Sequence, residues 1–225
     1  MKRGGRGGGG QRKRGEKALQ RRSRRRSEKT HILIVCEGKE TEPNYFRGLR
    51  DEEAVRQNFN VVVQKGKGGS CVVVIDQAIA ELEKAANRGE DFDEVWCVFD
   101  AEQSGQRKQV IQARTLASQH RIQVALSHPS FEVWLLAHFV RTKKSFADCE
   151  KVIAELNKHW RREFRRDYEK NDDQIYTRLA DRTRTAIDNA RKVRELDWTS
   201  SPDIVDSNSA TDVYLLVERL LGPPE

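Results

Sequence analysis

Short apolar runs alternate with amphipathic stretches over the first two thirds of the chain, and this alternation predicts the fold. The apolar runs are of strand length and rich in Val, Ile, Leu and Phe, and they lie at 31–37, 59–65, 93–100 and 121–127. Helical spacing predicts helices at about 41–56, 71–88, 106–120 and 131–139. Strands that alternate with helices form parallel sheets through right-handed crossovers. We therefore expect an α/β fold with a Rossmann-like parallel sheet flanked by helices.

The remainder of the chain has a different pattern, with long, highly charged helical stretches and no further strand-like run. The expected helices lie at about 147–168, 173–196 and 210–221. This change of pattern divides the chain into three parts: an N-terminal tail (1–29), an α/β domain (30–140) and a helical extension packed on the same domain (141–225).

The tail differs from everything that follows it. Residues 1–29 contain 13 Lys and Arg, two acids and many glycines, whereas the whole chain has a net charge of only +7. Such a segment cannot bury enough apolar surface to offset its ordering entropy, so we expect it to be disordered. Its arginines, with Arg24, Arg25 and Arg26 as the densest run, suit sequence-independent contact with nucleic-acid phosphates.

Cysteine usage and hydropathy bear on the location of the protein. The four cysteines form no CxxC pair and have no zinc-finger spacing, which is typical of reduced structural thiols. No apolar run approaches the roughly 20 residues needed to span a bilayer, and the basic N-terminus has no apolar segment of the kind found in secretory signals. We expect a cytoplasmic protein that does not bind membranes.

Acidic residues follow two of the predicted strands. Glu37 ends the first run, Asp100 ends the third, and Glu102 comes two residues later. Ligands of open parallel sheets bind at the carboxyl ends of the strands, and crowded carboxylates repel one another unless a cation lies between them. Mg²⁺ prefers hard oxygen ligands and often binds one or two carboxylates together with phosphate oxygens. The pattern predicts a Mg²⁺ or Mn²⁺ site, although polar strand ends are also common at ordinary sheet edges.

Four segments carry a resemblance to a known family: VCEGKETEPNYF, FDAEQ, SHPSFEVWLLAHF and NSATDVYLLVERL. Together they resemble the RloB-like family, which occurs beside bacterial restriction and phage-defence genes and looks like a divergent Toprim domain. The resemblance covers about residues 30–221. It implies a Toprim-like α/β domain with Glu37, Asp100 and Glu102 as metal-binding catalytic acids. Glu102 stands where the Toprim pattern usually has Asp. His128 stands where RloB-like chains usually have Asn, and it is a candidate for a supporting role at the site. Lys170 matches the lysine of a Tyr-x-Lys seen in the family, which implies a position near the scissile phosphate.

Other charged residues are candidates for supporting roles. Lys39 and Glu40 follow the first acid, and Glu132 lies in an otherwise apolar helix, where it either supports a ligand or forms a salt bridge. We assign Glu42 to the dipole of the following helix. Lys65 and Lys67 lie in a glycine-rich loop before a helix, which suits either phosphate contact or a plain surface loop. The stretch RREFRR at 161–166 suits backbone contact and base stacking, or a solvated helix face.

These observations favour a metal-dependent nuclease of the Toprim type that acts on DNA or RNA, with tRNA among the candidate substrates and a defence-system protein as a candidate partner. A non-catalytic nucleic-acid-binding or sensor subunit with the same fold is the alternative. A nucleotidyl transferase or other phosphoryl-transfer enzyme is a third. The segment GKET lacks the spacing of a P-loop, so the sequence excludes that class of NTPase.

Overall fold

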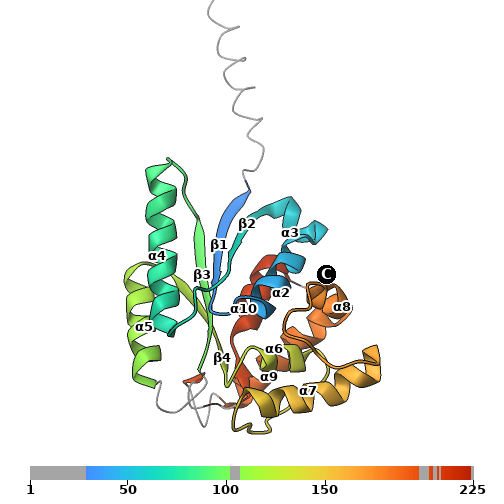
Figure 1. Ribbon diagram of the computed structural model, residues 1–225. Helices are drawn as coiled ribbons and strands as arrows, with labels where there is room; N and C mark the ends of the chain where they lie inside the picture. The colour runs from blue at the N-terminus through green and yellow to red at the C-terminus, as the bar shows by residue number, and fades with distance from the viewer. Residues whose placement is uncertain (1–28, 102–106, 198–202, 205–206, 208, 224–225) are drawn as a thin grey trace, which may run out of the picture.

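The computed structural model describes residues 29–101, 107–197, 203–204, 207 and 209–223. All of the predicted disordered tail except Lys29 therefore lies outside the described residues, including Arg24, Arg25 and Arg26, and so does Glu102. Within the described residues a five-stranded sheet has the order β2-β1-β3-β4-β5 (Figure 1). The strands are β1 (Thr30–Cys36), β2 (Phe59–Gln64), β3 (Glu94–Asp100), β4 (Gln123–His128) and β5 (Ala210–Thr211).

The first four strands are parallel, and β5 runs antiparallel to β4. On β1, Ile32 and Ile34 face one apolar cluster, whereas Leu33 and Val35 face another. All four side chains are buried, which explains why this strand is a continuous apolar run and not an alternating one. The α/β class and the Rossmann-like parallel sheet are confirmed.

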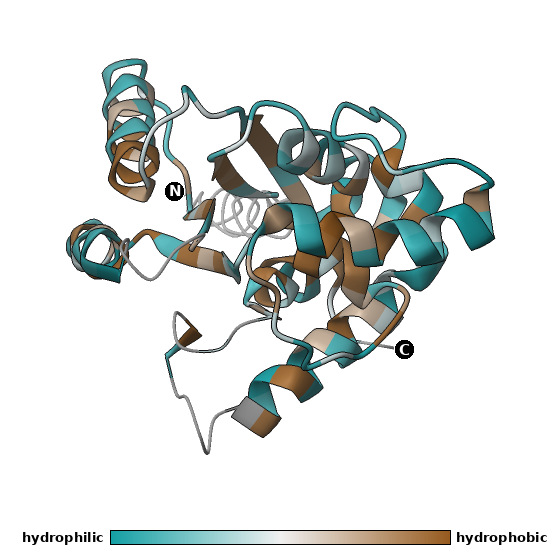
Figure 2. Ribbon diagram, turned by 60° about the horizontal axis from the view of Figure 1, so that its bottom comes forward, coloured by the Kyte–Doolittle hydropathy of each residue, from teal (hydrophilic) through white to brown (hydrophobic). Residues whose placement is uncertain are grey.

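Helices cover both faces of the sheet. One face is packed against α4 (Cys71–Asn87) and α5 (Arg107–Gln119), as Figure 1 shows. The other face is covered by α2 (Thr41–Arg50), α6 (Glu132–Ala137) and α10 (Val213–Leu221). Hydrophobic residues concentrate on the strands and on the helix sides turned toward them, and hydrophilic residues lie on the outer turns (Figure 2).

A second shell of helices extends the core on the α2 side. It consists of α7 (Cys149–Phe164), α8 (Ile175–Leu179), a 3-10 turn η2 (Ala180–Arg182) and α9 (Thr183–Asp197). Their apolar residues, Trp160 and Leu179 among them, belong to the same cluster as Ile32 and Ile34. The core on this face thus draws side chains from both sides of the predicted boundary at residue 140. None of the helices in the described part of the chain is long and apolar enough to cross a membrane.

Three predicted helices have different limits in the structure. The helix expected at 41–56 divides into α2 and α3 (Glu53–Asn58), because the Asp51 N–H bonds back to the Gly48 carbonyl and closes the first helix. The helix expected at 147–168 ends at Phe164, where Arg165 adopts the left-handed conformation (φ 59°). The helix expected at 173–196 is interrupted by η2.

The prediction that residues 210–221 form one helix was wrong at its start. Ala210 and Thr211 form β5, and the helix begins at Val213. The Ser209 N–H bonds to the His128 carbonyl at 2.9 Å, and the Asp212 N–H bonds to the Leu126 carbonyl at 2.7 Å. These two bonds attach the segment to the edge of β4, which overrides its helical pattern.

Candidate functional site

The carboxyl ends of β1 and β3 lie side by side, because these two strands pair directly with Cys36 opposite Val98. The pairing continues one residue beyond β1, where the Glu37 N–H bonds to the Val98 carbonyl at 2.8 Å. The Asp100 N–H in turn donates to Glu37 Oε2 at 2.9 Å. The structure therefore brings Glu37 and Asp100 together at the sheet edge that the sequence indicated.

A pocket of about 400 Å³ opens at this edge. Its walls come from residues 37–42 after β1, Asp100 at the end of β3, Phe131 and Glu132 at the start of α6, and Lys170 from the segment between α7 and α8. Six of the candidate residues thus line one cavity: Glu37, Lys39, Glu40, Asp100, Glu132 and Lys170.

Four carboxylates of this pocket, those of Glu37, Glu42, Asp100 and Glu132, influence one another. Burial raises the pKa of Asp100 well above its usual value, and the charges of Glu42, Glu132 and Glu37 raise it further, against a lowering by the Phe131 N–H. Burial also raises the pKa of Glu42, to about 7, with further increases from Glu132 and Glu37. Asp100 and Glu42 therefore hold their protons more tightly than isolated acids would.

Asp100 has a feature that suits a cation. Its Oδ1 is buried and has no hydrogen-bond partner among the described residues. A buried carboxylate oxygen without a partner is costly, and a divalent cation would compensate it. Glu37 and Asp100 together fit the one or two carboxylates with which proteins often hold Mg²⁺. In the described part of the chain, no three His, Cys, Asp or Glu side chains form a ready-made metal-binding group.

Glu132 is the centre of a polar network at the wall of the pocket. It is only 3% exposed. Lys170 Nζ lies 3.3 Å from Glu132 Oε1, the Tyr168 hydroxyl donates to the same oxygen at 3.3 Å, and the Cys149 thiol donates to Oε2 at 3.3 Å. Of the two roles considered for Glu132, the structure contains the salt bridge, and the cation in that salt bridge is a pocket-lining lysine.

The network also affects the protonation of its other members. Partial burial lowers the pKa of Lys170, but the Glu132 charge and the hydrogen bonds with Glu132 and Cys149 outweigh it, so the pKa lies above its usual value and the ammonium stays charged. Burial and the Glu132 charge raise the pKa of Cys149 to about 11. Cys149 is thus a neutral thiol that accepts from Lys170 Nζ at 3.4 Å.

Two glycines allow the strand-end loops to approach each other. The Gly66 N–H bonds to the Gly38 carbonyl at 3.0 Å, and a Cβ on Gly66 would lie 1.7 Å from the Glu37 carbonyl oxygen. The Gly38 N–H donates to Glu42 Oε1 at 3.2 Å, and a Cβ there would lie 2.1 Å from Glu42 Oε2. Gly66 therefore requires glycine for reasons of space, because the obstacle is backbone, whereas a Cβ on Gly38 would displace only the end of the Glu42 side chain.

The remaining candidates lie around the pocket or outside it. Lys65 and Lys67 are exposed on the loop after β2 and do not line the cavity. His128 also stays outside, and its Nδ1 contacts the Ala101 carbonyl oxygen. Phe164 packs against Trp160, with ring centroids 4.8 Å apart, so it is not free to stack on a base as RREFRR suggested.

Sequence reasoning missed three members of the site. Glu42 was assigned to the helix dipole, yet it is 7% exposed and lines the pocket. Thr41 bonds through its hydroxyl to the Tyr168 hydroxyl (3.1 Å) and the Lys170 carbonyl (2.9 Å). Cys149 was treated only as a structural thiol. For Glu42 the glycine four residues earlier was a signal, because it leaves room for the carboxylate to fold back.

The fold and the pocket define a Rossmann-like α/β protein with an acidic site at the carboxyl ends of adjacent parallel strands. A family model described as "RloB-like protein" matches residues 32–220, and the chain belongs to the RloB-like family. No curated protein and no solved structure matches the chain.

Proposed function

We propose that the protein is a Mg²⁺- or Mn²⁺-dependent nuclease of the Toprim type that hydrolyses phosphodiester bonds. The observation that carries the proposal is the juxtaposition of Glu37 with Asp100, whose buried Oδ1 has no partner in the described part of the chain, opposite the charged Lys170. The Toprim relationship and a role in antiphage defence stay predictions, and they rest on the resemblance stated above.

Each residue has a role in this proposal. Glu37 and Asp100 would hold the metal ion, which when bound polarises the phosphodiester and activates water. Lys170 lies on the pocket wall and offsets the negative charge of the phosphate. Glu42 has a pKa of about 7, so it can accept or hold a proton near neutral pH. Glu102 is proposed as a further ligand from its place after β3.

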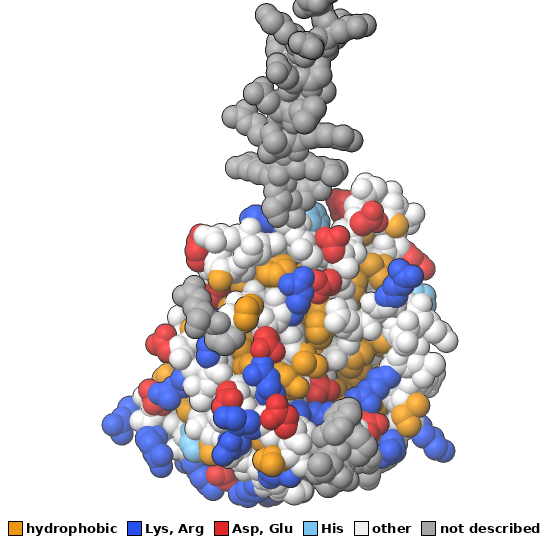
Figure 3. All heavy atoms as spheres, turned by 180° about the vertical axis from the view of Figure 1, so that it is seen from behind, with side chains coloured by type: hydrophobic (Ala, Val, Ile, Leu, Met, Phe, Trp, Pro, Cys, Tyr) orange, Lys and Arg blue, Asp and Glu red, His pale blue; other side chains and the backbone are white. Residues whose placement is uncertain are grey.

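Surface charge supports a nucleic-acid substrate. Figure 3 shows Lys and Arg side chains, interspersed with Asp and Glu, toward the lower end of the rear face. The parallel strands finish at this end (Figure 1). Arg162 and Arg165, at the end of α7, are exposed and have no ion-pair partner among the described residues. Such cations give affinity for a phosphate backbone without base specificity. The proposed substrate is accordingly DNA or RNA, including tRNA.

The decisive experiment is a cleavage panel of tRNA, single-stranded and duplex substrates with Mg²⁺, with Mn²⁺ and with EDTA. We expect metal-dependent cleavage of at least one substrate, and a loss of about 100-fold or more in Glu37→Gln. Glu83→Gln, which alters an exposed acid of α4, is the matched control and should keep full activity. Metal-independent cleavage, or equal cleavage by Glu37→Gln, would contradict the proposal.

One observation favours the alternative of a non-catalytic binding or sensor subunit: Glu102 stands where the Toprim pattern usually has Asp. The same panel separates the two functions. A sensor would bind the substrates with a Kd that Glu37→Gln leaves unchanged, and it would cleave none of them with either metal.

A further inference from the structure

The segment between α7 and α8, residues 165–174, delivers Lys170 to the pocket without forming a helix or strand of its own. We call this segment the strap. Irregular backbone has few hydrogen bonds of its own to fix it, so its conformation depends on side chains that bind it. The strap therefore needs dedicated anchors if Lys170 is to keep one position.

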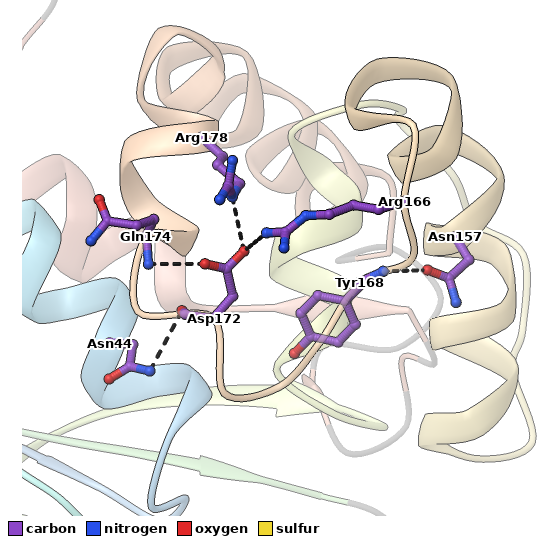
Figure 4. Close-up of polar contacts among 7 residues, drawn as sticks. All are labelled: Asn44, Asn157, Arg166, Tyr168, Asp172, Gln174 and Arg178. Atoms are coloured by element: carbon purple, nitrogen blue, oxygen red, sulfur yellow. Dashed lines mark hydrogen bonds and ion pairs between the residues drawn. The ribbon is translucent and has the colours of Figure 1, made fainter.

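Asp172 is the anchor at the far end of the strap, as Figure 4 shows. Its carboxylate binds the Arg166 guanidinium, accepts from Arg178 Nε at 2.9 Å and accepts from the Gln174 N–H at 3.0 Å. The Asp172 side chain is only 6% exposed, whereas those of Arg166 and Arg178 are 40% and 34% exposed. One buried carboxylate thus joins the beginning of the strap to the helix that follows it.

Other contacts hold the strap against two further elements, α7 and α2. The Tyr168 N–H donates to Asn157 Oδ1 of α7 at 2.7 Å (Figure 4). Thr41 at the start of α2 donates to the Lys170 carbonyl at 2.9 Å, and Asn44 of α2 reaches the Asp172 carbonyl at 3.5 Å. Asp172 is the member of this set whose side chain is charged, buried and bound to two cations. Its loss should therefore weaken the attachment of the strap more than the loss of any other member.

We propose that Asp172 is a positioning residue that holds the strap so that Lys170 stays paired with Glu132 at the pocket wall. Asp172 does not line the pocket, so it acts through Lys170 and not on the substrate. The consequence for cleavage rests on the proposed nuclease function. The consequence for the position of Lys170 does not.

The first test measures the Lys170 amine directly and needs no enzymatic activity. The full chain is labelled with a limiting amount of an amine-acylating reagent, and the modification of Lys170 is measured by mass spectrometry relative to the exposed Lys151. Asp172→Asn should increase the labelling rate of Lys170 about threefold or more, because the amine leaves its contacts with Glu132 and Cys149. An unchanged Lys170 rate in a folded Asp172→Asn variant would overturn the proposal.

Asp167→Asn is the matched control. Asp167 belongs to the same strap and pairs with Arg161, but its side chain is 52% exposed and none of its described contacts reaches the pocket. This variant should label at Lys170 like the wild type. If Asp167→Asn and Asp172→Asn increased labelling equally, the effect would be a general loosening of the strap and the specific role of Asp172 would be wrong.

The second test is a double-mutant cycle on the cleavage rate. A misplacement of about 1 Å at an active site can reduce the rate 100-fold, so we expect Asp172→Asn to reduce kcat/KM at least tenfold. In a Lys170→Met background the same substitution should change it less than twofold, because the residue through which Asp172 acts is absent. Additive losses would overturn the proposal.

The two tests separate failure of this inference from failure of the proposed function. Suppose that no variant cleaves nucleic acid but that Asp172→Asn still increases the labelling of Lys170. The nuclease function would then be wrong, and the positioning role of Asp172 would stand. If Asp172→Asn does not fold, Arg178→Gln is the substitute variant, because it removes one of the two cations bound to the Asp172 carboxylate. It should increase Lys170 labelling in the same way. No increase in Arg178→Gln would then overturn the proposal.

Discussion

At the residue scale, ionisation of the buried acids lowers the stability of the folded state, and this effect can be measured. A carboxyl that is costly to ionise in the folded state loses this cost when the chain unfolds, so folding and proton binding are linked. Glu42 is the clearest case, because its pKa of about 7 in the folded protein is well above the value of about 4.3 for an unperturbed Glu. The folded state therefore binds more protons than the unfolded state between these two values.

The sign of this linkage gives a prediction for Glu42. The contribution of Glu42 to the stability of the metal-free protein should fall as the pH rises from about 4.3 to about 7, by up to about 4 kcal/mol, and level off above pH 7. Glu42→Gln should remove that contribution and be more stable than the wild type at pH 8. Urea unfolding in EDTA across pH 4.5–8 measures both proteins.

The difference between the two curves is the informative quantity. His138 is buried with a pKa lowered to about 4, so its contribution to stability rises with pH between about 4 and 6.5, opposite in sign to that of Glu42. That contribution is the same in both proteins and cancels in the difference. A Glu42→Gln variant that is less stable than the wild type at pH 8 would contradict a raised Glu42 pKa.

At the element scale, the site depends on the close approach of two strand-end loops. Gly66 is the point of contact, because the space that a Cβ would occupy is taken by the Glu37 carbonyl. A methyl group there must push the loop after β2 away from the loop after β1. The backbone of Glu37 would move with it.

Gly66→Ala should therefore destabilise the protein by about 1–3 kcal/mol, the usual cost of overpacking a close contact. Gly89→Ala is the control, because Gly89 has φ +71° but nothing within 4 Å of an added Cβ. It should show only the backbone strain of about 1 kcal/mol. Urea unfolding measures both, and equal losses in the two variants would show that the contact at Gly66 is not tight.

The elements that could be predicted are those whose pattern is local. The four parallel strands are long apolar runs, and the neighbouring positions of Glu37 and Asp100 follow from two such runs ending on acids. β5 could not be predicted, because two residues are too few to show a hydrophobic periodicity. Its pairing with β4 joins residues that are more than 80 positions apart in the sequence. The contact of Glu132 with Lys170 has the same origin, since the strap that carries Lys170 has no pattern of its own.

At the scale of the whole molecule, charge is divided between the tail and the folded body. Residues 1–29 carry 13 Lys and Arg, and the chain as a whole has a net charge of +7. The rest of the chain is therefore mildly acidic. Attraction to a polyanion over the length of the tail would be independent of base sequence and sensitive to salt.

Deletion of residues 1–29 should weaken binding to nucleic acid and reduce the slope of log Kd against log salt concentration, because fewer counterions are released. The thermal midpoint should change little, because the tail has few apolar residues to bury. Filter binding at several salt concentrations and a thermal melt measure the two effects. A midpoint lowered by 5 °C or more would show that the tail contributes to the fold.

The position of α10 has a consequence for the order in which the protein is built. Val213, Leu216 and Val217 pack in the same cluster as Ile32 and Ile34, which lie about 180 residues earlier. During synthesis β1 leaves the ribosome early, yet the helix that covers one of its faces is made late. Contacts between such distant residues slow folding, and the uncovered face of β1 is apolar until α10 arrives. We therefore expect the acidic pocket to assemble after translation has passed residue 220, with the nascent chain relying on chaperones until then.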